Sequence, residues 1–211
     1  MAKREYEFIA VDFQKDFTET NGLCYVDGSS IDFVKHELTA FLLEKNIKAH
    51  EIISDYRLPR LSRKISSCDP NTEGFVSELS DEIKYTDPWI KCMHNPLWTR
   101  DNIGLKDKEP GIPYQDPVKF DLWLKNHIGF SNDNKEIVIF GLTMEVCVLA
   151  LAQELYFRGY KVNVLYEATD PMNERMKYKD FIAKHSTLSL YANILSFKEL
   201  KKLMIGCDSC E

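Results

Sequence analysis

Three polar residues interrupt or end apolar segments of the sequence, and together they could form a nucleophilic site. Asp12 ends the first apolar run, Lys91 lies inside "PWIKCM", and Cys147 follows "EIVIFGL" by a few residues. A thiol must lose its proton before it attacks a carbonyl carbon, and a carboxylate within reach can take that proton. A neighbouring ammonium and a helix N-terminus would both favour the thiolate. These residue types indicate cysteine-based acyl transfer if the fold brings them together.

Each of the three residues also has a purely structural interpretation. Asp12 could close a turn at a strand end, and Lys91 could extend its charge to solvent from an edge strand. Cys147 could be a small buried apolar residue. His94, close to Lys91 in the chain, is expected to be a loop residue or to support the site rather than to react.

The elements that would position these residues follow an alternating pattern. Apolar runs predict six strands, at 7–11, 51–54, 88–93, 136–142, 161–168 and 193–197. Apolar residues at helical spacing predict helices at 29–46, 117–128, 144–158, 172–186 and 198–205. This alternation is typical of an α/β domain with a mainly parallel sheet. Ligands of such sheets bind beyond the carboxyl ends of the strands, which is where all three polar residues fall.

The whole chain is expected to form one domain, 1–211, with long loops at about 57–87 and 94–116 on the substrate side. A net charge of -6 argues against a nucleic-acid-binding surface. The absence of a long apolar run argues against a membrane span, and the absence of a leader pattern indicates a cytoplasmic location. The six cysteines are expected to be free thiols, including the Cys207 and Cys210 pair.

Three segments carry a resemblance to a known family. "VDFQKDF" and "GLTMEVCV" resemble the two signature motifs of the isochorismatase-like cysteine hydrolases, and "IKCMHNPLW" resembles the segment that carries the family's lysine. This superfamily includes nicotinamidases, N-carbamoylsarcosine amidohydrolases and ureidoacrylate amidohydrolases. The resemblance implies a Rossmann-like three-layer sandwich with a six-stranded, mainly parallel sheet. It also implies a homo-oligomer, either a dimer or a tetramer.

The resemblance further implies a role for each site residue. Cys147 would be the nucleophile, Asp12 the general base and acid, and Lys91 their electrostatic partner. The family's non-proline cis peptide would join Leu142 and Thr143. The backbone N–H groups of Thr143 and Cys147 would then form an oxyanion hole.

One departure from the family concerns metal binding. Nicotinamidases carry Asp-x-His-x-x-x-His after the second strand, whereas this chain has Asp55 followed by Arg57 and Leu61 at the histidine positions. One carboxylate beside an arginine does not make a divalent metal site. The sequence therefore predicts neither a metal nor another cofactor.

Several residues are candidates for substrate binding. Phe17 matches a family position that lines the pocket. Arg57, Arg60 and Arg100 carry guanidinium groups suited to a carboxylate, although each could equally be a solvated loop arginine. Trp98 could form an aromatic wall of the pocket or belong to the core.

These observations predict a metal-independent cysteine amidohydrolase. It would cleave a C–N bond of a small amide, ureido or carbamoyl compound through a thioester intermediate. Two alternatives stay open: an isochorismatase-type vinyl-ether hydrolase, which does not need Cys147, and a non-catalytic small-molecule-binding protein of the same fold. The expected partner is a small-molecule substrate, with no nucleic acid and no membrane. The sequence does not name that substrate.

Overall fold

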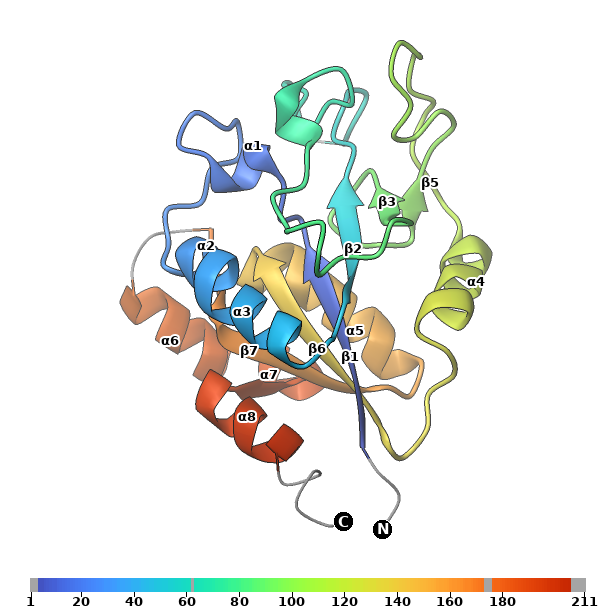
Figure 1. Ribbon diagram of the computed structural model, residues 1–211. Coiled ribbons are helices and arrows are strands. Elements are labelled where there is room, and N and C mark those ends of the chain that lie inside the picture. The colour runs from blue at the N-terminus through green and yellow to red at the C-terminus, as the bar shows by residue number, and fades with distance from the viewer. Residues whose placement is uncertain (1–3, 62, 173–175, 206–211) are drawn as a thin grey trace.

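The computed structural model describes residues 4–61, 63–172 and 176–205, so the Cys207 and Cys210 pair lies outside the described residues. A six-stranded sheet with the order β3-β2-β1-β6-β7-β8 forms the centre of the molecule (Figure 1). Its strands are β1 (Glu5–Val11), β2 (Ala49–Ser54), β3 (Trp89–Lys91), β6 (Lys135–Leu142), β7 (Lys161–Asp170) and β8 (Asn193–Leu195). All neighbouring strands run parallel. The predicted α/β class and the six predicted strands are confirmed.

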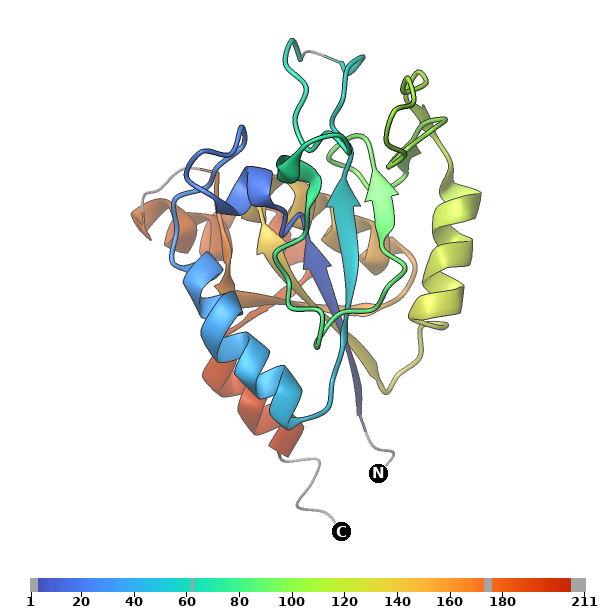
Figure 2. The same ribbon diagram turned by 45° about the horizontal axis from the view of Figure 1, so that its top comes forward.

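Helices cover both faces of the sheet. They are α1 (Lys15–Thr18), α2 (Ser30–Phe33), η1 (Val34–Leu38), α3 (Thr39–Glu44), α4 (Pro117–His127), η3 (Met144–Val148), α5 (Leu149–Phe157), α6 (Met176–His185), α7 (Leu188–Tyr191) and α8 (Phe197–Ile205). Figures 1 and 2 show α2, α3 and α8 on one side of the sheet, and α4 and α5 on the other. No helix of the described residues is long and apolar enough to cross a bilayer.

The predicted helices and loops differ from the structure in detail. The helix predicted at 29–46 consists of α2, the π-helical turn η1 and α3 in succession, and the one predicted at 144–158 begins with the π-helical turn η3. The two long loops are not wholly irregular. They contain the 3₁₀ turn η2 (Glu73–Phe75) and a small antiparallel pair of strands, β4 (Trp98–Thr99) and β5 (Tyr114–Gln115).

The central strand β1 shows why the sequence of this sheet is a continuous apolar run. Phe8 and Ala10 pack into the core on one face, while Ile9 and Val11 pack into the core on the other. Because helices bury both faces of a parallel sheet, its central strands need apolar residues at every position. The apolar run stops at Asp12, at the edge where the sheet meets the long loops.

The carboxyl ends of β1 and β6 meet where the strand order reverses. The chain adds β2 and β3 on one side of β1, and it adds β7 and β8 beyond β6. Gly141 near the end of β6 has a φ of 112°, and a Cβ atom there would lie 2.1 Å from the carbonyl oxygen of Val11. Only glycine permits this close approach. Such reversal points are where open α/β sheets bind their ligands.

Candidate active site

Asp12, Lys91 and Cys147 converge at this edge of the sheet, and all three side chains are buried. The Nζ atom of Lys91 lies 2.8 Å from Oδ2 of Asp12 and 3.5 Å from Sγ of Cys147. The three residues follow or end β1, β3 and β6, which are far apart in the chain. The structure therefore places one ammonium in contact with both a carboxylate and a thiol.

The Asp12 carboxylate is fixed from several directions. Its backbone has a φ of 50°, in a region that few non-glycine residues adopt, and its N–H donates to the carbonyl oxygen of Ile52 at 2.9 Å. Ser54 at the end of β2 donates from Oγ to Oδ1 of Asp12 at 2.7 Å. Lys91 also donates to Ser54 Oγ, at 2.7 Å. Each carboxylate oxygen thus has a donor, as a buried charge requires.

Gln14 holds Ser54 in this position. Its Nε2 donates to the carbonyl oxygen of Ser54 at 3.0 Å, and its Oε1 accepts from the Ser54 N–H at 2.7 Å. Nε2 also donates to the carbonyl oxygen of Phe75 at 2.9 Å, which ties η2 to the site. Gln14 belongs to "VDFQKDF", but the sequence alone did not indicate this positioning role.

Tyr56 is a site residue that the sequence reasoning missed. Its buried hydroxyl accepts a hydrogen bond from Lys91 at 2.8 Å and lies 3.4 Å from Sγ of Cys147. Because the oxygen accepts from Lys91, its own proton is free to point toward the sulfur. The only sequence signal was its place two residues after the end of the second predicted strand.

Burial sets the resting protonation of the thiol. It raises the pKa of Cys147 to about 12, although Lys91 acts to lower it. Lys91 thus favours the thiolate, as expected, but burial outweighs this effect in the resting state. Burial acts to lower the pKa of Lys91. The negative charges of Asp12 and of an ionised Cys147 act to raise it and outweigh burial, so the pKa of Lys91 is raised. At neutral pH the site holds a thiol beside an ammonium–carboxylate ion pair.

Cys147 lies in the turn that follows β6. The peptide bond between Leu142 and Thr143 is cis. The carbonyl oxygen of Thr143 accepts hydrogen bonds from the N–H groups of Val146 and Val148, both at 3.1 Å. These bonds close the wide turn of η3 and hold Cys147 against the edge of the sheet.

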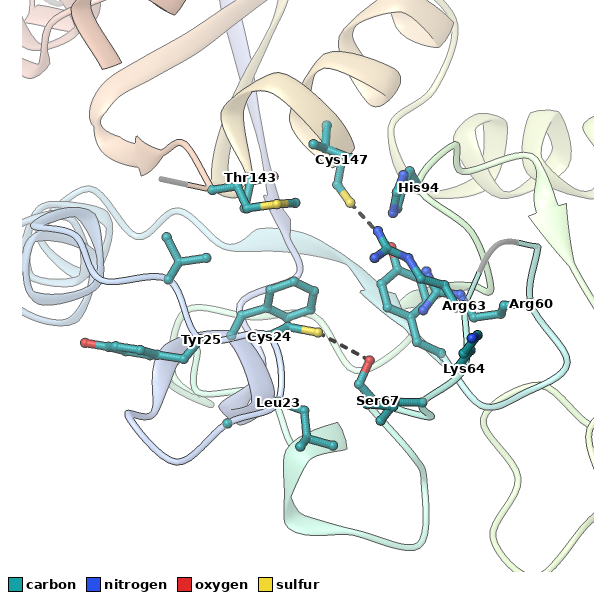
Figure 3. Close-up of a pocket in the computed structure, with 17 residues that line it drawn as sticks. Leu23, Cys24, Tyr25, Arg60, Arg63, Lys64, Ser67, His94, Thr143 and Cys147 are labelled. Carbon is teal, nitrogen blue, oxygen red and sulfur yellow. Dashed lines mark hydrogen bonds between the residues drawn. The ribbon is translucent and has the colours of Figure 1, made fainter. Parts of the chain in front are cut away.

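A cavity of about 610 Å³ opens over Cys147, and Thr143 also lines it (Figure 3). Phe17 belongs to its lining and packs edge-on against Tyr56, with ring centroids 6.3 Å apart. His94 lies beside Cys147 in Figure 3. Burial, followed by the charge of Lys91 and of nearby arginines, lowers the pKa of His94 to about 4, so its ring is neutral at pH 7.

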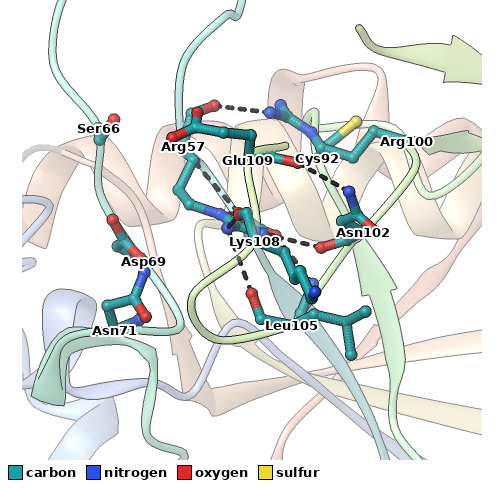
Figure 4. A network of polar contacts seen from close by, with 12 residues as sticks. Arg57, Ser66, Asp69, Asn71, Cys92, Arg100, Asn102, Leu105, Lys108 and Glu109 are labelled. Carbon is teal, nitrogen blue, oxygen red and sulfur yellow. Dashed lines mark hydrogen bonds and ion pairs between the residues drawn. The ribbon is translucent and has the colours of Figure 1, made fainter. Parts of the chain in front are cut away.

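Three residues expected to bind substrate do not line this cavity. Arg57 and Arg100 are buried in a polar network below the loops (Figure 4). Arg100 donates to the carbonyl oxygens of Arg57 and Pro59, at 3.0 and 3.3 Å. Trp98 lies in β4, paired with Gln115. The lining of the cavity therefore does not support their assignment to the substrate site.

The guanidinium of Arg57 is bound almost entirely by the protein. Its Nε and Nη2 atoms donate to the two carboxylate oxygens of Asp55, at 2.9 and 2.6 Å. It also donates to the carbonyl oxygens of Asn102 at 2.9 Å and Lys108 at 2.6 Å. Arg57 therefore fastens the loop at 102–108 to the end of β2.

The fold of this chain, but not its sequence, matches known proteins. No model of a protein family matches the sequence, and no curated protein matches it. The structure is similar to an isochorismatase-like hydrolase from Alkaliphilus metalliredigens, with a TM-score of 0.64 and 18% identity over 94% of this chain and 98% of that chain. The chain has the fold of the isochorismatase-like hydrolases.

Two further structures with this fold carry the names of specific enzymes. One is the pyrazinamidase of Pyrococcus horikoshii in complex with zinc, with a TM-score of 0.58 and 19% identity over 92% of this chain and 99% of that chain. The other is N-carbamoylsarcosine amidase from Thermoplasma acidophilum, with a TM-score of 0.56 and 14% identity over 91% of this chain and 96% of that chain.

The zinc in one of these structures raises the question of a metal beside β2. In the present isochorismatase-like fold, Arg57 binds both carboxylate oxygens of Asp55, and the N–H of Gly104 also donates to Oδ2 at 2.9 Å. A guanidinium in this place repels a divalent cation and uses the lone pairs that the cation would need. Among the described residues no three His, Cys, Asp or Glu side chains are grouped so as to hold a metal. The residues present at this position do not fit one.

The contact between Tyr56 and Cys147 predicts a measurable effect of Tyr56→Phe. We expect kcat/KM to fall by about 10- to 100-fold, because a hydrogen bond to a charged group contributes about 1.5–3 kcal/mol. The hydroxyl of Tyr56 acts to lower the pKa of Cys147, so alkylation of Cys147 by iodoacetamide should also need a higher pH in the variant. Tyr156→Phe, on the exposed side of α5, is the matched control. An unchanged alkylation profile in Tyr56→Phe would show that the hydroxyl does not act on the sulfur.

Proposed function

We propose that this protein is a metal-independent cysteine hydrolase that cleaves a C–N bond of a small amide, ureido or carbamoyl compound. The observation that supports this proposal is the position of Lys91, whose Nζ contacts both the Asp12 carboxylate and the Cys147 sulfur below an open cavity. Two of the structures with the same fold are amidases by name, which is consistent with it.

The first step forms a bond between the sulfur and the substrate. Asp12 takes the proton of Cys147, and the sulfur attacks the carbonyl carbon. Before the proton moves, the ammonium of Lys91 pairs with the negative charge on Asp12. After the proton has moved, the negative charge lies on the sulfur of Cys147, 3.5 Å from the same ammonium. The net charge of the three side chains does not change, so no uncompensated ion is created in the buried site. A thiol whose pKa is raised by burial can react in this way.

The later steps release the amine and then the acid. The carbonyl oxygen becomes an oxyanion, which the N–H groups of Thr143 and Cys147 stabilise; loss of one such donor costs ~10²–10³ in rate in comparable sites. Asp12 returns the proton to the nitrogen, the C–N bond breaks, and a thioester remains on Cys147. Water then gives a proton to Asp12 and attacks the thioester. The C–S bond breaks, and Asp12 reprotonates the sulfur.

A search for the thioester tests this function. A panel of amides and ureido acids is assayed for ammonia release, and the reaction with any substrate found is quenched with acid and analysed by intact-protein mass spectrometry. We expect an acyl adduct on the peptide that contains Cys147. Turnover with no adduct under single-turnover conditions would contradict the covalent mechanism and favour direct attack of water on the carbonyl carbon. A protein that binds members of the panel but hydrolyses none of them would be a binding protein.

A further inference from the structure

One wall of the cavity over Cys147 is cationic. Arg60, Arg63 and Lys64 line it, and Figure 3 shows them together on one side of the pocket. The lining contains no Asp or Glu among the described residues, although the whole chain carries 33 acidic and 27 basic side chains. Within the described part of the chain, no carboxylate forms an ion pair with any of these three side chains. The positive charge of this wall is therefore uncompensated.

Arg60 is the innermost of the three. Its Cζ atom lies 3.5 Å from the centroid of the Tyr56 ring, and the hydroxyl of the same ring lies 3.4 Å from Sγ of Cys147. The guanidinium is thus separated from the nucleophile by one aromatic ring. Its Nε is buried and has no hydrogen-bond partner among the described residues, and burial lowers the pKa of Arg60. A poorly solvated donor of this kind gains more from an incoming anion than an arginine in water would.

We propose that the substrate carries a carboxylate, which Arg60 binds while the scissile carbonyl lies at Cys147. This inference rests on the hydrolase function proposed above and narrows its substrate class. One face of the guanidinium is stacked on Tyr56, so its planar edge remains to donate. Two parallel N–H groups in one plane match the two oxygens of a carboxylate. Arg63 and Lys64 are exposed and would attract the anion to the mouth of the cavity.

The rest of the cavity supports this orientation. The wall opposite the cationic one is formed by residues such as Leu23 and Tyr25, and Met172 also belongs to the lining. The positive potential of this wall also acts on His94. Burial and the charge of Lys91 lower the pKa of His94 most, and the charges of Arg60 and Arg63 lower it further. An apolar segment between the carboxylate and the amide would fit such a cavity.

Paired probes that differ only in charge test the inference. Glutaramate and terephthalamate are each compared with their methyl esters. Binding is measured by calorimetry on the Cys147→Ala variant, and ammonia release is measured with the wild-type protein. We expect each acid to bind about 10- to 100-fold more tightly than its ester. Arg60→Leu should remove this preference without weakening the ester, and Arg60→Lys should keep part of it.

Lys198→Leu on the exposed surface of α8 is the control, because it removes the same charge far from the cavity. Equal binding of acids and esters would overturn the inference. So would no binding of either acid, or equal weakening of acid and ester by Arg60→Leu. Failure of the proposed function would look different: selective binding of the acids without ammonia release would keep the carboxylate site and refute the hydrolase.

Discussion

Replacement of Cys147 by alanine is expected to lower kcat by a factor on the order of 10⁴–10⁶, as removal of a nucleophile does in other covalent hydrolases. The variant loses the sulfur that is proposed to form the thioester, while Asp12, Lys91 and the cavity stay in place. Its fold should be retained, because the substitution removes only the sulfur atom and leaves the Cβ among the same apolar side chains. Turnover and the far-ultraviolet circular dichroism spectrum of the same preparation check both parts.

Cys68→Ala is the matched control for this experiment. Cys68 is also a buried thiol whose pKa is raised by burial, but it does not line the cavity. Its variant should keep most of the activity. If Cys147→Ala hydrolysed a verified substrate at the wild-type rate, the nucleophile would have to be sought elsewhere.

Lys91→Met should cost the protein both stability and activity. Asp12 would keep its buried charge without the ammonium that lies 2.8 Å away. Removing one partner of a buried ion pair costs about 3–5 kcal/mol, which for a chain of this size corresponds to a fall in Tm of roughly 6–20 °C. Turnover should fall as well, because no cation remains to hold the charge that moves from Asp12 to the sulfur. Calorimetric melting and activity assays at the same pH measure the two effects.

A second substitution separates stability from catalysis. In Asp12→Asn/Lys91→Met, the amide carries no charge, so part of the lost stability should return while activity stays absent. This result would appear as a coupling free energy between the two positions. A Lys91→Met protein with wild-type stability would indicate that Asp12 is not charged in the folded state, and the proposed proton transfer would have to be revised.

Much of the fold could be predicted because it depends on local patterns. The central strands β1 and β6 are buried on both faces, so each contains a short apolar run that stands out from its surroundings. Asp12 and Lys91 were recognisable for the same reason, since a charged residue in or directly after such a run needs a partner. Because each lies at or near the carboxyl end of a predicted parallel strand, both were expected at one edge of the sheet.

The misassigned residues depend on contacts that no local pattern encodes. Arg57 and Arg100 were expected to meet a substrate carboxylate, but backbone carbonyls of distant loops and Asp55 bind them. Tyr56 was missed because an aromatic residue after a strand is usually part of the core. The raised pKa of Cys147 could not be predicted, because the depth of burial that dominates it follows from the packing of the whole domain.

The salt bridge between Arg57 and Asp55 has a consequence for how this domain could change in evolution. A cation that is part of the polypeptide is present as soon as the chain folds, and no chelator can remove it. It also cannot be exchanged for a metal by one substitution. Arg57→His would release the loop at 102–108 and supply a single imidazole, while Leu61 points largely into solvent. A change from the arginine to metal ligands would therefore also require new contacts to hold the loop at 102–108.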